Sequence, residues 1–123
     1  MFIKRLAAIG AATVALAGVG VATAGPASAT VETNRWCASD WSGDWTVCVV
    51  EQTDQDGSRW YYGHGWNTVN QYIIVNLYDG SGNYLDTGDG YGWAATPRYQ
   101  RGFVACIYDA IRGFSFVCAE RPR

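Results

Sequence analysis

Four cysteines constrain the fold of this chain more than any other feature of its sequence. The chain has 123 residues, and its cysteines are Cys37, Cys48, Cys106 and Cys118. A zinc site does not fit this spacing, because there is no C-x-x-C pair and only one histidine. We therefore expect two disulfides, which small exported domains use to supplement a thin hydrophobic core.

The first 29 residues have the features of a secretory signal peptide. Lys4 and Arg5 precede an uncharged run over 6–23, and Ala27-Ser28-Ala29 places small residues where a signal peptidase reads. An uncleaved membrane anchor is the alternative, because the 18 residues of this run are just enough to span a bilayer. Alanine and glycine are only weakly apolar, so we expect cleavage after Ala29. The product is then a secreted, extracellular protein with a single disulfide-stabilised domain over 30–123.

The predicted mature chain, residues 30–123, is mildly acidic. It contains seven arginines, no lysine and eleven acidic residues, which gives a net charge of −4. Such a surface lacks the broad basic stripe that neutralises phosphates. We therefore expect neither nucleic acid nor a membrane as a partner after cleavage, and we expect a monomer without a cofactor.

Hairpin geometry favours pairing of the cysteines in sequence order. If Cys37 faces Cys48 across a hairpin, the turn centres between Ser42 and Gly43 and forms a two-residue loop that ends in glycine. Glycine tolerates the positive φ that such a loop requires. Directly opposed residues on antiparallel strands are also close enough for a disulfide.

The second pair gives the same result. If Cys106 faces Cys118, Ile111-Arg112-Gly113 becomes a three-residue loop with Gly113 in its left-handed position. The pairing Cys37–Cys48 and Cys106–Cys118 is therefore the prediction.

An immunoglobulin-like pairing of Cys48 with Cys106 is the alternative. Trp60 follows Cys48 at a suitable distance to pack on such a bridge. These domains carry a tyrosine two residues before the second cysteine, however, and that position here is Val104.

Short apolar stretches separated by glycine and aspartate predict an all-β fold. Candidate strands are Arg35–Ser39, Trp45–Glu51, Arg59–Tyr62, Gln71–Tyr78, Asn83–Asp86, Tyr91–Ala94, Gly102–Tyr108 and Gly113–Ala119. Candidate turns are Asp54-Gln55-Asp56-Gly57, Asp79-Gly80-Ser81-Gly82 and Thr87-Gly88-Asp89-Gly90. The pattern indicates a small antiparallel β-sandwich or barrel of about seven or eight strands. Because Gln71–Tyr78 is apolar on both faces, this strand is either central or presents an aromatic surface.

Aromatic residues are the strongest indication of function. Residues 30–123 contain six Trp, eight Tyr and three Phe, so rings with a polar edge predominate. Such rings suit wet interfaces and stack on the apolar faces of sugar rings. Gly63-His64-Gly65-Trp66 is the expected exposed aromatic loop. Core packing is the competing interpretation of these aromatics. The predicted binding residues are Arg59, Trp60, Tyr61, Tyr62, His64 and Trp66.

Catalysis and metal binding have weaker support in the sequence. His64 is the only imidazole, and glycines on both sides do not suit an oriented catalytic base. Asp79, Ser81 and Asn83 alternate as calcium ligands would, but Tyr84 stands where a calcium loop needs glycine. A hairpin loop explains them better. We expect no catalytic residue and no metal site.

The sequence therefore predicts a secreted, non-enzymatic protein that binds an extracellular carbohydrate or cell-wall surface. Inhibition of a secreted amylase or protease is the alternative. Arg59-Trp60-Tyr61 is similar in composition, though not in order, to the Trp-Arg-Tyr triplet of small secreted α-amylase inhibitors of actinobacteria. The cysteine spacings differ from that family. A small secreted antimicrobial protein or toxin is a third possibility.

Overall fold

The computed structural model describes residues 30–111, 113 and 115–123, and Val31–Arg123 form one compact unit. The predicted signal peptide, 1–29, lies outside the described residues. The unit consists of β1 (Val31–Ser39), β2 (Trp45–Thr53), β3 (Arg59–Asn67), β4 (Tyr72–Asp79), β5 (Tyr84–Tyr91), β6 (Trp93–Ala95), β7 (Gly102–Asp109) and β8 (Ser115–Glu120). Every predicted strand corresponds to one of these eight.

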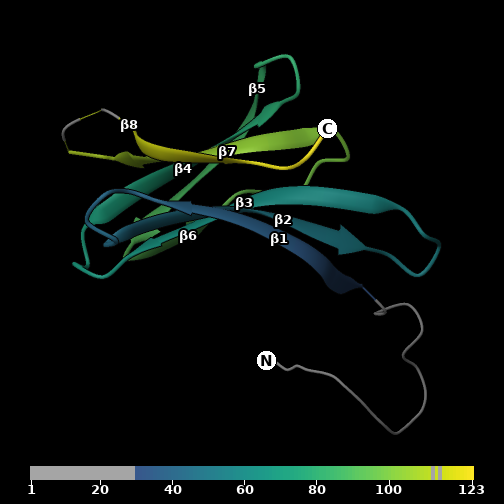
Figure 1. The fold of residues 1–123 in the computed structure, drawn as a ribbon, viewed down its shortest axis with the longest axis horizontal. Helices are drawn as coiled ribbons and strands as arrows, with labels where there is room; N and C mark the ends of the chain where they lie inside the picture. The colour runs from purple at the N-terminus through teal and green to yellow at the C-terminus, as the bar shows by residue number, and fades with distance from the viewer. Residues whose placement is uncertain (1–29, 112, 114) are drawn as a thin grey trace, which may run out of the picture. The chain divides into compact units, whose positions relative to one another are not determined.

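The strands form two four-stranded antiparallel sheets that pack face to face (Figure 1). The first sheet has the order β1-β2-β3-β6, and the second has the order β5-β4-β7-β8. The chain makes a three-stranded meander, crosses to the second sheet for β4 and β5, returns for β6 and crosses again for β7. The predicted antiparallel β-sandwich is confirmed.

The core lies between the sheets and is built from alternate residues of each strand. Ile73, Val75 and Leu77 of β4 are fully buried and face Val47 and Val49 of β2 in one apolar cluster. Burial of such side chains contributes about 1.5–3 kcal/mol each to the free energy of unfolding. The strand predicted over 71–78 is central, between β5 and β7, and its outer residues Tyr72, Ile74, Asn76 and Tyr78 are half-buried.

Both predicted disulfides are present. Cys37 lies opposite Cys48 in the β1–β2 register, and Gly43 has a φ of 78°. The connecting loop is longer than predicted, because the Asp40 N–H donates to the Trp45 carbonyl and leaves the four residues 41–44 beyond this pair. The Asp40 carboxylate holds the loop by accepting hydrogen bonds from the Ser42 hydroxyl and the Trp45 N–H.

The second disulfide joins Cys106 of β7 to Cys118 of β8, again directly opposite in register. Gly113 has a φ of 80°, and its N–H donates to the Asp109 carbonyl at 2.8 Å. Gly113 therefore has the left-handed conformation predicted for this connection. The connection is longer than the three residues predicted, because the register shifts between Ile107 and Tyr108 and the strands end at Asp109 and Ser115. Arg112 lies outside the described residues. Pairing of Cys48 with Cys106, as in immunoglobulin domains, is excluded.

The turn predicted over Thr87-Gly88-Asp89-Gly90 is wrong, because all four residues belong to β5. The two glycines face the backbone of β6 instead. A Cβ atom on Gly88 would lie 1.9 Å from the Ala95 carbonyl oxygen, and one on Gly90 would lie 2.4 Å from that of Trp93. These glycines close one side of the sandwich, since only a residue without a side chain lets β6 pass this close to β5.

Candidate functional site

Strand β3 presents a line of ring-bearing side chains on the outer face of the first sheet. Its residues alternate between half-buried and buried positions along the strand. The outward residues are Trp60, Tyr62, His64 and Trp66, and the inward residues are Tyr61, Gly63, Gly65 and Asn67. Outward residues on one strand are about 6.6 Å apart, so the four side chains follow one another along a single row.

The loop predicted over Gly63–Trp66 is wrong, because these residues lie within β3. Its two glycines are needed where the strand packs against the second sheet. A Cβ atom on Gly65 would lie 2.7 Å from Val75 Cγ2 and 3.0 Å from Ile107 Cδ1. A Cβ atom on Gly63 would lie 3.0 Å from both Val75 Cγ1 and Ala105 Cβ of the second sheet. The glycines thus allow close packing of the two sheets, and their outward neighbours sit on a rigid strand.

Trp93 extends the row onto the neighbouring strand. It lies opposite Trp66 in the β3–β6 register, and its ring meets that of His64 edge-on at 6.2 Å between centroids. His64 also packs against Trp66, with ring centroids 5.2 Å apart. Trp93 is 62% exposed. We call Trp60, Tyr62, His64 and Trp66 together with Trp93 the aromatic row.

His64 is uncharged at neutral pH. Burial and the nearby Arg35 guanidinium lower the pKa of its imidazole from 6.5 to about 4. Arg35 Nη1 donates to Nδ1 at 3.2 Å, so the proton of the neutral ring is on Nε2. Arg35 is held in turn by the Glu32 carboxylate, with Nε to Oε2 at 2.9 Å. His64 therefore offers an N–H donor between two tryptophans and is a poor base.

This pKa makes the stability of the domain depend on pH. An unfolded chain takes up a proton on His64 near pH 6.5, whereas the folded domain does so only near pH 4. The free energy of unfolding should therefore fall by about 2 kcal/mol as the pH is lowered through this range. This is less than the free energy that corresponds to the whole pKa shift, because solvent screens the partly exposed ring. Urea unfolding at pH 7 and pH 4 measures the change, and His64→Gln should make it smaller by about 2 kcal/mol, leaving the part that comes from the carboxylates. An NMR titration of the imidazole with a midpoint above pH 6 would contradict this prediction.

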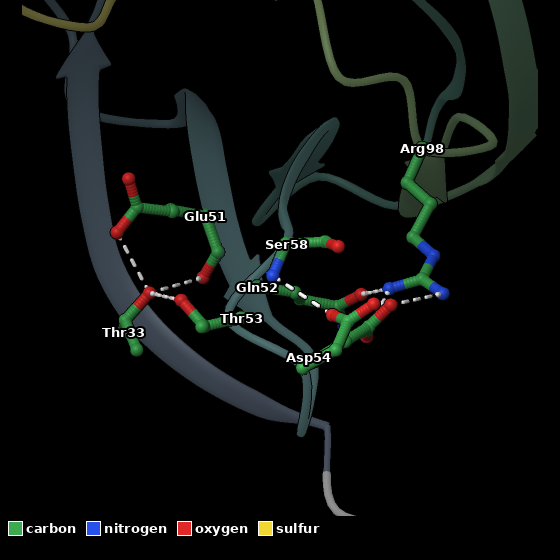
Figure 2. A network of polar contacts seen from close by, with 8 residues as sticks. Thr33, Glu51, Gln52, Thr53, Asp54, Ser58 and Arg98 are labelled. Carbon is green, nitrogen blue, oxygen red and sulfur yellow. Dashed lines mark hydrogen bonds and ion pairs between the residues drawn. The ribbon is translucent and has the colours of Figure 1, made fainter.

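Arg98 covers the opposite end of the aromatic row. Its guanidinium lies 4.8 Å from the ring centroid of Trp60, and the buried Trp60 Nε1 has no hydrogen-bond partner. Asp54 holds Arg98 in place, with Nη1 to Oδ1 at 2.9 Å, and Gln52 Oε1 accepts a longer hydrogen bond from it (Figure 2). The row is thus covered at Trp60 and open at Trp66 and Trp93.

Two predicted binding residues stand apart from the row. Tyr61 is only 6% exposed, and its hydroxyl donates to Glu51 Oε2 at 2.9 Å, so direct contact with a ligand does not fit its position. Arg59 is exposed at the start of β3.

Glu51, the partner of Tyr61, is a buried carboxylate. Burial raises its pKa, but hydrogen bonds from Thr33, Asn34 and Tyr61 outweigh this effect and lower the pKa overall. The hydrogen bond from Thr33 also ties β1 to β2 (Figure 2).

A cavity of about 300 Å³ adjoins the open end of the aromatic row. It lies between β5 and β6 and is lined by Asp89, Gly90, Tyr91, Trp93, Ala94 and Ala95. This volume is at the lower limit of small-molecule sites. Trp93 therefore contributes both to an exposed aromatic surface and to the wall of a shallow hollow.

Sequence reasoning missed Trp93, Arg35 and Arg98 as parts of this surface. Trp93 reaches this surface through pairing of β3 with β6, and Arg35 reaches it through pairing of β1 with β2. Arg98 reaches it from the connection before β7. The period-two spacing of Trp60, Tyr62, His64 and Trp66 could have identified the row itself.

The described part of the chain contains neither a metal-binding cluster nor a membrane-spanning helix. No group of three His, Cys, Asp or Glu residues there is arranged to hold a metal ion. No helix there is long and apolar enough to cross a membrane.

Comparison with known proteins adds no family. The chain matches no protein-family model, and no curated protein or solved structure is significantly similar to it.

Proposed function

We propose that this protein is a secreted, non-enzymatic module that binds an extracellular polysaccharide through the aromatic row. The single observation that carries the proposal is the exposed end of that row, where Trp66, His64 and Trp93 form one ring surface beside a cavity. Two disulfides indicate an oxidising, extracellular-type environment.

The chemistry of the row suits sugars. Indole rings offer flat apolar surfaces for the apolar face of a pyranose, and their polar edges tolerate water. The neutral His64 Nε2–H, the Tyr62 hydroxyl and the Arg35 guanidinium supply hydrogen-bond donors for sugar hydroxyls. A charged imidazole would instead require a compensating anion.

The same geometry supports binding rather than catalysis. The Nδ1 lone pair of His64 is taken by Arg35, and its pKa of about 4 leaves it unprotonated and weakly basic at neutral pH. The Glu51 carboxylate is 5% exposed and has three side-chain donors, so it does not face the row.

A pull-down on insoluble chitin, cellulose and peptidoglycan tests this proposal. The oxidised protein should be depleted from solution by at least one matrix. Trp66→Ala and Trp93→Ala should each weaken retention about tenfold or more, because each removes an aromatic contact worth about 1.5–3 kcal/mol.

Trp41→Ala is the matched control, because Trp41 is 97% exposed but lies outside the row. It should bind as the unmodified protein does. No depletion on any matrix would contradict the proposal, as would equal loss of binding in all three variants. A panel of secreted hydrolases would then test inhibition as the alternative.

A further inference from the structure

One end of the sandwich exposes apolar side chains in or directly beside four connections. These connections follow β1, β3, β5 and β7, and the β1–β2 and β7–β8 hairpins are seen at the left of Figure 1. The exposed side chains are Trp41 (97%), Ile111 (81%), Tyr91 (71%), Trp93 (62%) and Val69 (45%). They are five of the seven large hydrophobic side chains that are exposed in the described residues. We call this set the apolar end.

Hydrogen bonds tie the four connections together. The Thr68 N–H and hydroxyl both donate to Asp44, at 3.0 and 2.7 Å. The Gly92 N–H donates to the Gln71 carbonyl at 3.0 Å, and the Ala110 N–H donates to the Tyr72 carbonyl at 3.3 Å. The exposed side chains thus belong to one continuous end of the domain.

Local hydrogen bonds hold the backbone beside Trp41 and at Ile111. In the first hairpin, the Gly43 N–H donates to the Asp40 carbonyl at 3.0 Å. In the second, the Ile111 N–H donates to the Asp109 carboxylate at 2.8 Å. Each hairpin is also braced by a disulfide between its strands. Backbone groups that are already paired in this way enter a medium poor in water at a lower cost than unpaired ones.

The charges of the apolar end select among lipid surfaces. Asp40 and Asp44 lie in the same loop as Trp41, and the donors to their carboxylates are neutral: the Ser42 hydroxyl, the Trp45 N–H and the Thr68 hydroxyl. By sequence, Arg112 is the only basic residue in the four connections. Carboxylates beside an exposed indole repel an anionic surface and attract a quaternary ammonium, which also binds to the ring face.

We infer that the apolar end docks on a bilayer of zwitterionic lipids with choline headgroups. Single side chains on convex tips suit a fluid interface, where tryptophan and tyrosine are enriched. The expectation of no membrane partner rested on the acidic net charge. That charge disfavours an anionic surface but not this one.

Co-sedimentation with phosphatidylcholine vesicles tests the inference. The oxidised protein over residues 30–123, which includes the whole compact unit, should sediment with these vesicles and not with phosphatidylglycerol vesicles. The double variant Trp41→Ser/Ile111→Ser should lose about tenfold or more of this binding, because it removes two apolar anchors. Tyr84→Ser, which changes a side chain 57% exposed outside the apolar end, should bind unchanged.

Three binding results would overturn the inference: absence of binding to phosphatidylcholine, equal binding to phosphatidylglycerol, and unchanged binding of the double variant. A fourth result, concentration-dependent dimerisation that the double variant abolishes, would overturn it by assigning the apolar end to a second copy of the chain. Trp66 lies in the aromatic row and outside the apolar end, so Trp66→Ala should leave vesicle binding intact. Polysaccharide binding and lipid binding can therefore fail separately.

Discussion

Removal of both disulfides is expected to unfold this domain at 37 °C. Each disulfide closes a loop of similar length, with sequence separations of 11 and 12 residues. The loss of chain entropy in the unfolded state is then worth about 3 kcal/mol for each bridge. Together they account for much of the 5–15 kcal/mol that is usual for a small domain. Thermal unfolding followed by circular dichroism, with and without reductant, measures the effect.

Paired alanine variants separate the two contributions. Cys37→Ala/Cys48→Ala and Cys106→Ala/Cys118→Ala should each lower Tm by about 15 °C, because the two loops are nearly equal in length. A reduced protein that melts within about 3 °C of the oxidised one would contradict this account. A domain in which only one of the two paired variants lowers Tm would also contradict it, because loops of nearly equal length predict nearly equal losses.

Replacement of Gly88 by alanine is expected to cost about 3 kcal/mol or more of the free energy of unfolding. The added Cβ would lie 1.9 Å from the Ala95 carbonyl oxygen and 2.6 Å from its carbon. Both atoms belong to the main chain, so no rotation of a side chain relieves the overlap. Strand β6 must move away from β5, which disturbs its pairing with β3 and displaces Trp93 from the aromatic row.

Gly80→Ala is the matched control for this substitution. A Cβ on Gly80 would meet its nearest neighbour, Arg123 Nη1, at an ordinary 3.6 Å. The control should change stability by less than about 1 kcal/mol. Urea unfolding gives the free energies, and the indole N–H resonance of Trp93 reports displacement of β6. A Gly88→Ala domain as stable as the control would show that β5 and β6 are not in close contact.

The fold could be predicted from the sequence because its determinants are local. Alternation of apolar residues identified the strands, and glycine with aspartate identified the turns at 54–57 and 79–82. Counting from Cys37 to Cys48 and from Cys106 to Cys118 placed Gly43 and Gly113 in the turns, and both have the positive φ that this arithmetic required. Hairpin pairing is therefore readable when the turn chemistry and the cysteine spacing agree.

Glycine also caused the main errors. Gly63, Gly65, Gly88 and Gly90 were interpreted as loop or turn residues, whereas all four lie within strands. Glycine serves both where a chain turns and where two backbones or sheets approach closely. Only the tertiary neighbours distinguish the two cases. For Gly65 these neighbours are Val75 and Ile107, and for Gly88 the neighbour is Ala95.

The candidate site was only partly predictable for a related reason. Trp60, Tyr62, His64 and Trp66 follow one another along a single strand, so the sequence contains their relationship. Trp93 joins them through pairing of β3 with β6, and Arg98 reaches Trp60 from the connection before β7. Neither contact leaves a local pattern, because each depends on how the two sheets are assembled.

An NMR titration tests the central proposal most directly. The ¹⁵N-labelled protein would be titrated with a soluble oligosaccharide of whichever polysaccharide retains it. The indole N–H resonances of Trp66 and Trp93 should shift together and saturate, while those of the core Trp45 and the exposed Trp41 stay in place. Shifts confined to Trp41, or to the tyrosines on the outer face of β4, would place binding elsewhere and contradict the assignment of the aromatic row.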